Sequence, residues 1–360
     1  MSRGQVVLEL PPSPGNPRNS EGSFVALRDG TILFAYTRFV GRGGDDHDVA
    51  ELAVCRSADG GRTWSEPAPL LACEGAWNTM SVSLLRLADG RISLLYLVKN
   101  GFHDCRPRVR FSSDEAASWS GPVPVIAAPG YFVVNNDRLV QLRCGRLIMP
   151  AAFHRCRLED GRSIAAFDSR GVAMWFLSDD AGATWREAET WWALPVPSRS
   201  GLQEPGVVEL SDGRLWSWCR TDTGCQWQTH SADGGLTWTP PRPTAFRSPC
   251  SPMSVRRVPA TGELLAIWND RSGGFSLPEP AEASHERTPL VAAISPDDGA
   301  TWPHRVLLED DPARGFCYTA VHFTDDAHVL LAYCAGGAET GGILNLLRLR
   351  RVPLEALRGA

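Results

Sequence analysis

The feature that most constrains the fold of this chain is an eight-residue segment that recurs five times. The five boxes, as we name these segments, are SADGGRTW at 57–64, SSDEAASW at 112–119, SDDAGATW at 178–185, SADGGLTW at 231–238 and SPDDGATW at 295–302. Ser and Asp side chains stabilise tight turns through nearby backbone groups, and Gly supplies backbone angles that other residues resist. A binding site would differ between copies. We therefore interpret the boxes as structural turns, each closed by its Trp against its own sheet.

A second repeated pattern lies between the boxes and consists of an apolar run, a turn and another apolar run. It occurs at 27–33, 87–93, 142–148, 210–216 and 259–265, and in a degenerate form at 323–331. Asp-Gly between alternating apolar residues is a strong signal of a β-hairpin. Six such units of four short strands predict an all-β, six-bladed β-propeller that forms a single domain over 1–360, with the boxes away from its central pocket. A strand at about 5–10 is expected to join the last blade and close the ring, which protects sheet edges.

Composition excludes several classes of function. The net charge of −5 argues against a broad basic surface for nucleic acid. No run reaches the 18 or so apolar residues of a membrane span, and the first residues do not form a secretory leader, so a cytoplasmic location is expected. The ten Cys include no C-x-x-C pair and the His have no metal-site spacing. We expect no metal, no cofactor, no nucleic acid and no membrane as partners.

The boxes, together with the six hairpin units, resemble the Asp-box sialidases (neuraminidases) over nearly the whole chain. The closest segment is QEPGVVELSDGRLWSWCR at 203–220, where Glu204 and Arg220 lie eight residues on either side of the Asp of SDG. The resemblance implies that Glu204 activates the nucleophile and that Arg220 binds a substrate carboxylate. It also implies that Arg287, eight residues before the Ser of the last box, binds the same carboxylate, and that Tyr318 in GFCYTAVHF is the nucleophile.

For the third Arg of this clamp, the set of Arg that would hold the carboxylate, the resemblance leaves two candidates. The family's R-I-P motif has become R-N-S at Arg18, with Glu21 close behind, and Arg38 is the alternative. Polar residues also begin the second and third units, where they line the pocket or cap the ends of blades. These possible pocket residues are Asn78, Asn136, Asp137 and Arg138.

The residue that protonates the leaving group is expected in the loop GRGGDDHDVA at 41–50. Alignment with the family places its Asp opposite His47, between Asp46 and Asp48. We prefer Asp48 slightly, because it lies nearest the following strand, with Asp46 close behind and His47 as the third candidate.

These residue types suit one reaction. A sialic acid carries a carboxylate on its anomeric carbon, which Arg side chains bind by charge and by paired hydrogen bonds. An anionic nucleophile would be repelled by that carboxylate, whereas a neutral Tyr is not, and the sialidase Tyr is a known exception among retaining glycosidases. Because Tyr has a pKa of about 10, it needs a base beside it. The resemblance thus implies a retaining exo-glycosidase that removes terminal sialic acid, or a related 2-keto acid sugar, from glycoconjugates.

Two alternatives remain open from the sequence. The first is a hydrolase or lyase that acts on a uronate-type carbohydrate, which the altered R-N-S-E segment and the position of His47 favour. The second is a non-catalytic propeller that binds carbohydrate. The presence of Glu204 together with Tyr318 argues against the second alternative, because a lectin has no need of a base beside a phenol.

Overall fold

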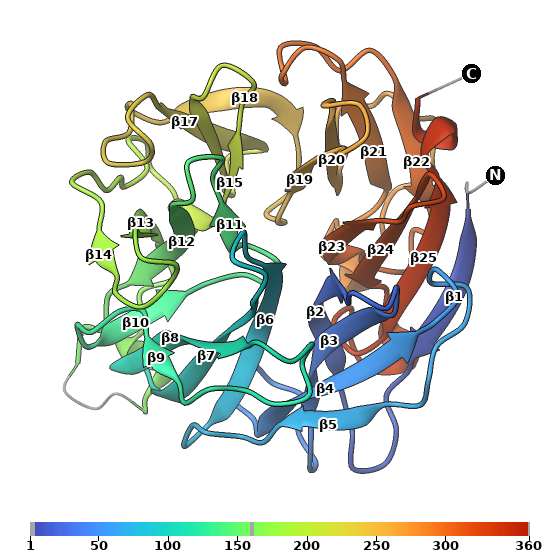
Figure 1. Ribbon diagram of the computed structural model, residues 1–360. Coiled ribbons are helices and arrows are strands. Elements are labelled where there is room, and N and C mark those ends of the chain that lie inside the picture. The colour runs from blue at the N-terminus through green and yellow to red at the C-terminus, as the bar shows by residue number, and fades with distance from the viewer. Residues whose placement is uncertain (1–3, 159–161, 359–360) are drawn as a thin grey trace.

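Short β-strands are the main secondary structure in the computed structural model, which describes residues 4–158 and 162–358. The sheets surround a common centre, and the strands nearest the two chain ends lie side by side at one edge (Figure 1). Within the described residues, helix is limited to short 3₁₀ segments. These are η1 (Ile164–Ala166), η2 (Glu282–Ser284), η3 (Ala338–Thr340) and η4 (Leu354–Leu357). The predicted all-β class is confirmed.

Three sheets have four strands in chain order. The first contains β2 (Asn19–Ala26), β3 (Ile32–Phe39), β4 (Ala50–Ser57) and β5 (Ala68–Leu71). The next contains β15 (Gln203–Glu209), β16 (Leu215–Arg220), β17 (Cys225–Ser231) and β18 (Arg242–Arg247). The third contains β19 (Ser254–Arg257), β20 (Leu264–Asn269), β21 (Leu290–Ser295) and β22 (Arg305–Glu309). A fourth four-stranded sheet joins the chain ends in the order β1 (Gln5–Leu10), β25 (Leu347–Pro353), β24 (His328–Cys334) and β23 (Cys317–Phe323).

The remaining sheet has nine strands. Its first part contains β6 (Asn78–Arg86), β7 (Ile92–Gly101), β8 (Asp104–Ser112) and β9 (Val123–Pro124). Its second part contains β10 (Gly130–Val133), β11 (Val140–Gln141), β12 (Leu147–His154), β13 (Val172–Ser178) and β14 (Arg186–Glu187). A short parallel pairing of β8 with β10, at Asp104 and Cys105, links two otherwise antiparallel groups.

All six predicted hairpins are confirmed as antiparallel pairs. In the first, the Asp29 carboxylate accepts a hydrogen bond from the Thr31 N–H at 2.9 Å, and Gly30 takes a φ of 85°. Glycine is favoured there because a Cβ disfavours positive φ. The same Asp-to-backbone bond recurs at Asp89 and Asp212.

The boxes share one network of hydrogen bonds. In 231–238 the Ser231 hydroxyl donates to Asp233 at 2.7 Å and accepts from the Gly235 N–H at 2.9 Å. The Thr237 N–H and hydroxyl donate to the two oxygens of Asp233 at 2.9 and 2.5 Å. The other four boxes repeat these bonds, with Ser118 in place of Thr in 112–119. Each box joins the last two strands of its unit, and no box residue lines the central cavity described below.

The core lies between adjacent sheets. One buried cluster combines Phe24 and Phe34 of the first sheet with Ala320 and Leu330 of the sheet that holds both chain ends. Burial of each large apolar side chain stabilises the fold by about 1.5–3 kcal/mol. This cluster therefore holds the first sheet against the sheet that contains both chain ends.

A bulge recurs near the start of one strand in four sheets, namely β2, β6, β15 and β23. At each bulge one residue has a positive φ: Glu21 at 55°, Ser81 at 58°, Glu204 at 48° and Tyr318 at 60°. Such angles are unfavourable for residues with a Cβ and are concentrated at functional sites. Because a bulge redirects a side chain, these four residues all reach the same central cavity.

Candidate active site

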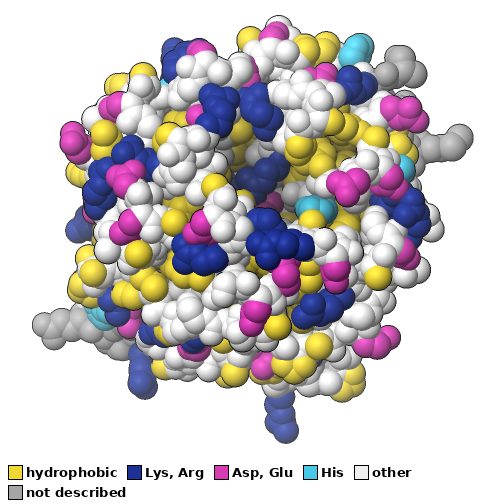
Figure 2. All heavy atoms as spheres, viewed as in Figure 1, with side chains coloured by type: hydrophobic (Ala, Val, Ile, Leu, Met, Phe, Trp, Pro, Cys, Tyr) yellow, Lys and Arg dark blue, Asp and Glu magenta, His cyan; other side chains and the backbone are white. Residues whose placement is uncertain are grey.

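A cavity of about 370 Å³ lies where the sheets meet. It is lined by Glu21, Asp46, His47, Met80, Ser81, Leu97, Lys99, Tyr131, Val133, Asn135, His154, Ile164, Phe167, Gln203, Glu204, Arg220, Arg287, Tyr318 and Leu344. These residues come from all five sheets or their loops, so only the closed arrangement brings them together. Lys and Arg side chains gather around a central hollow on the face shown in Figure 2.

Tyr318, Glu204 and Arg220 form one hydrogen-bonded group in this cavity. The Tyr318 hydroxyl donates to Glu204 Oε1 at 3.0 Å, and Arg220 Nη1 donates to the same oxygen at 2.8 Å. Arg220 Nη1 also lies 3.4 Å from the Tyr318 hydroxyl. Burial, and then the charge of Glu204, raise the pKa of Tyr318 well above its usual value. The phenol is therefore neutral and can lose its proton only to a base in contact with it.

Arg287 lies beside this group. Its guanidinium carbon is 5.6 Å from the centre of the Tyr318 ring, and Nη1 is 3.1 Å from the sulfur of Cys317. Nη2 reaches the Cys250 carbonyl at 3.5 Å, and Nε has no partner among the described residues. A buried guanidinium without a carboxylate partner retains its attraction for an anion.

Arg18 is buried next to the cavity but not on its wall. Its Nη1 donates to Asp46 at 2.6 Å and to the Gly44 carbonyl at 3.2 Å, while Nη2 lies 3.4 Å from Glu21. It lines an adjoining cavity of about 410 Å³ that shares Asp46 and Leu344 with the central one. Arg38, the alternative clamp residue, is paired with Glu51 on the next strand and lies outside both cavities.

The 45–48 loop places Asp46, and not Asp48, on the cavity wall. Asp48 instead accepts the Asp45 N–H at 2.8 Å, which closes a tight turn. The Asp46 side chain is 53% exposed, so desolvation opposes its ionisation only in part, and the charges of Arg18 and Lys99 hold the pKa of Asp46 well below its usual range.

His47 also lines the cavity. Its ring packs at 4.7 Å from Trp77 and 4.9 Å from Phe102, and burial is the main cause that lowers its pKa. Asn78 lies behind the loop and donates to the carbonyls of Asp46 and Asp48 at 2.8 and 3.1 Å. Asn78 therefore holds the loop in place.

The 136–138 segment lies outside the cavity wall and connects inner strands. Asn136 donates to the Tyr318 carbonyl at 3.2 Å. Asp137 accepts from the Ser23 hydroxyl at 2.9 Å and pairs with Arg256 at 2.9 Å. Arg138 donates to the Met253 carbonyl at 2.8 Å. The structure thus places this segment, which was expected to line the pocket or cap blades, between the sheets.

The sequence reasoning did not assign a role to several wall residues. Glu21 is 4% exposed, accepts the Ser81 hydroxyl at 2.5 Å, and has a pKa raised mainly by burial. Lys99 is 5% exposed, and its Nζ donates to the Asp46 carbonyl at 3.0 Å. His154 Nδ1 lies 3.0 Å from the Asp168 carbonyl, which leaves Nε2 as an acceptor. The one signal for Lys99 is a charge at the end of the apolar run ISLLYLV.

A second Tyr–Glu–Arg cluster shows that proximity alone does not make a site. The Tyr333 hydroxyl donates to Glu309 at 2.6 Å, and Arg348 and Arg350 donate to the same oxygen, each at 2.7 Å. Tyr333 is fully buried and does not line the central cavity. This cluster is a ready internal control for the one around Tyr318.

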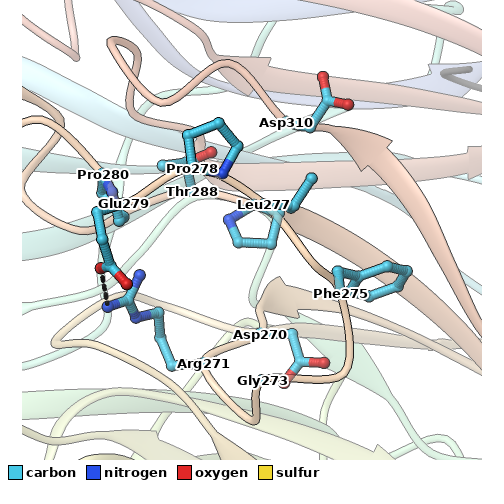
Figure 3. A pocket seen from close by; sticks show the side chains of 11 residues that line it. Asp270, Arg271, Gly273, Phe275, Leu277, Pro278, Glu279, Pro280, Thr288 and Asp310 are labelled. Carbon is cyan, nitrogen blue, oxygen red and sulfur yellow. Dashed lines mark ion pairs between the residues drawn. The ribbon is translucent and has the colours of Figure 1, made fainter.

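Another cavity of about 250 Å³ lies in the long connection between β20 and β21, the segment that also carries Arg287 (Figure 3). Its charged residues include Arg271, 3.9 Å from Glu279, and Asp270, which pairs with Arg305 at 3.1 Å. Because Arg271 and Asp270 are both paired, this cavity offers weaker electrostatic attraction to an anion than the central one.

Residues 4–158 and 162–358 contain neither a cluster of metal-binding side chains nor a membrane-spanning helix. No group of three or more His, Cys, Asp or Glu in this part of the chain is placed to hold a metal ion. No helix there is long and apolar enough to span a bilayer.

The chain is similar in sequence to known sialidases. A sialidase of Micromonospora viridifaciens is 28% identical over 322 residues, which cover 80% of this chain and 46% of that protein. The chain thus spans about half the length of that relative. A sialidase of Clostridium perfringens is 24% identical over 356 residues, covering 86% of this chain and 84% of that protein.

A solved structure supports the fold. The leech intramolecular trans-sialidase, in complex with 2,7-anhydro-Neu5Ac, matches with a TM-score of 0.72 at 16% identity, over 100% of this chain and 71% of that one. The family model described as BNR repeat-like domain matches residues 30–331, which is most of the chain. The chain therefore belongs to the BNR repeat-like family, within the Asp-box sialidase superfamily.

Proposed function

We propose that the chain is a retaining exo-glycosidase of the sialidase type, which hydrolyses terminal sialic acid or a related 2-keto acid sugar from glycoconjugates. Its sheets are proposed to form the six blades of a single β-propeller, with the nine-stranded sheet counted as two blades. The observation that carries the functional proposal is the 3.0 Å hydrogen bond from Tyr318 to Glu204, beside Arg220 and Arg287 in the central cavity.

In the proposed first step, the Tyr318 oxygen attacks the anomeric carbon and its proton passes to Glu204. The bond to the leaving oxygen breaks, and that oxygen takes a proton from an acid. Arg220 and Arg287 bind the substrate carboxylate and hold the anomeric carbon against the phenol. In the second step, water replaces Tyr318 at that carbon, and the phenol recovers its proton from Glu204.

Asp46 is the proposed acid of the first step and the base that activates water in the second. It is preferred over Asp48 because it lies on the cavity wall, whereas the Asp48 carboxylate is used inside its own loop. His47 is less suitable as an acid because its ring is packed against Trp77 and Phe102, with ring centres 4.7 and 4.9 Å away.

The test is the substitution Tyr318→Phe, assayed on an aryl α-sialoside. We expect kcat to fall by about a hundredfold or more with normal folding, because the nucleophile is lost while the ring stays. The matched control is Tyr333→Phe, which removes a buried hydroxyl from the second Tyr–Glu–Arg cluster and should lower the melting temperature without changing kcat. A Tyr318→Phe enzyme with near wild-type kcat would remove Tyr318 from the mechanism.

A second candidate is a glycosidase for another acidic sugar, such as a uronate. Glu21 and Lys99 on the cavity wall favour this candidate, since their carboxylate and ammonium groups can form hydrogen bonds with hydroxyls of the sugar. Assays on aryl α-sialosides, aryl uronides and neutral aryl glycosides separate the two candidates. Turnover of the uronide alone would replace the sialidase assignment.

A further inference from the structure

The proposed acid, Asp46, and one Arg of the clamp, Arg18, form an ion pair with each other. Arg18 Nη1 lies 2.6 Å from an Asp46 oxygen, and the Arg18 side chain is 2% exposed whereas that of Asp46 is 53% exposed. The buried partner is fixed by further bonds to Ser20, at 3.0 Å, and Gly44, at 3.2 Å. The exposed carboxylate is therefore the partner that can move.

Asp46 also separates Arg18 from the central cavity. Asp46 and Leu344 line both the central cavity and the adjoining one that contains Arg18. If the Asp46 carboxylate turns away, the Arg18 guanidinium faces the central cavity, which Arg220 and Arg287 line. A bound carboxylate can meet all three Arg only after Asp46 has left its place.

We propose that a substrate carboxylate displaces Asp46 from Arg18, and that the released Asp46 side chain takes up a proton from solvent and becomes the acid of the reaction. Arg18 thereby keeps Asp46 ionised until an acidic sugar has bound, and then binds the carboxylate of that sugar. This inference rests on the proposed function and deepens it, because it makes the substrate carboxylate a requirement for proton donation as well as for binding.

The charge balance around Asp46 supports uptake of a proton at that residue. The charged and titratable groups around it are Arg18, Glu21, Asp45, His47, Asp48, Lys99 and Tyr131, with His285 across the adjoining cavity. While Asp46 is paired with Arg18, the charges of Arg18 and Lys99 favour its ionised carboxylate. A ligand carboxylate on Arg18 removes the nearer cation and adds a negative charge close by, and both changes favour the protonated form.

The experiment is calorimetric titration of the wild-type protein with free sialic acid at about pH 5.5, where an ordinary carboxylate is ionised. Repeating it in acetate and in MES, which differ in ionisation enthalpy, gives the number of protons taken up with each ligand. We expect a net uptake that approaches one proton for each ligand bound. The affinity should therefore fall as the pH rises, by up to about tenfold per pH unit across the range of uptake.

Two isosteric variants identify the group. Asp46→Asn should bind the ligand without proton uptake, whereas Glu21→Gln, which changes the other carboxyl beside Arg18, should retain the uptake. Binding by wild type without uptake, or uptake that survives in Asp46→Asn, overturns the inference but leaves the proposed function intact. Failure of the wild type to bind the sugar acid at all would overturn the proposed substrate class and this inference with it.

Discussion

The substitution Glu204→Gln tests the proposed base directly. Glu204 Oε1 accepts from both Tyr318 and Arg220, while Oε2 is buried without a hydrogen-bond partner among the described residues. Gln keeps the size of the side chain but cannot take the Tyr318 proton. Because the Tyr318 pKa is raised, removal of the base leaves a phenol that does not ionise on its own.

The expected loss follows from the magnitude of general base catalysis. A positioned base contributes about 10²–10⁴ in rate, which corresponds to about 2.7–5.4 kcal/mol of transition-state stabilisation. Arg220 also loses its charged partner, and a hydrogen bond to a charged group contributes about 1.5–3 kcal/mol to stability. We therefore expect kcat to fall by at least about a hundredfold and the melting temperature to fall by a few degrees.

The assay is kcat on an aryl α-sialoside at saturating substrate, together with thermal unfolding. The matched control is Glu209→Gln on the same strand, where Glu209 pairs with Arg143 at 3.3 Å outside the central cavity. That variant should lose stability without losing kcat. A Glu204→Gln enzyme that retains kcat within tenfold of wild type would refute the assignment of Glu204 as the base.

Three further predictions follow from the geometry. Arg287→Ala should lower kcat/KM on a sialoside roughly tenfold or more, because it removes a charge-assisted hydrogen bond of about 1.5–3 kcal/mol. On the matching carboxamide, kcat/KM should change little. Equal losses on both substrates would argue against a clamp. Asp46→Ala should slow cleavage of a natural disaccharide by about 10²–10⁴ and cleavage of an aryl glycoside far less, because only the poor leaving group needs a proton. Asp48→Ala should affect the two substrates equally. The reverse pattern would make Asp48 the acid. The Asp180 pKa is lowered to about 2, first by its side-chain hydrogen bond from the Thr184 hydroxyl, so the folded state holds fewer protons than the unfolded one between about pH 4 and pH 2. The contribution of Asp180 to stability is complete above about pH 4 and is lost as the pH falls towards about 2. The free energies of unfolding of wild type and Asp180→Asn, measured with denaturant, should therefore converge over that range. A constant difference between the two would refute the role of this box.

Local features of the fold and site could be read from the sequence. The hairpins and boxes were predictable because each depends on residues within about eight positions of one another. Glu204 and Arg220 belong to the same category, since the hairpin at 210–216 pairs Gln203 with Arg220 and so brings the two side chains together. For such residues the turn chemistry fixes the register, and the register fixes the contact.

Contacts between distant segments were decided only by the tertiary structure. Tyr318 meets Glu204 across 114 positions because the sheets close around one centre. The choice of Asp46 over Asp48 depends on Asn78 and Lys99, which hold the loop backbone from the next sheet and turn one carboxylate inwards. Spacing along the chain does not encode the partners that another sheet supplies. The physical reason is that a short polar loop has several conformations of similar energy, and packing against the rest of the protein selects one of them.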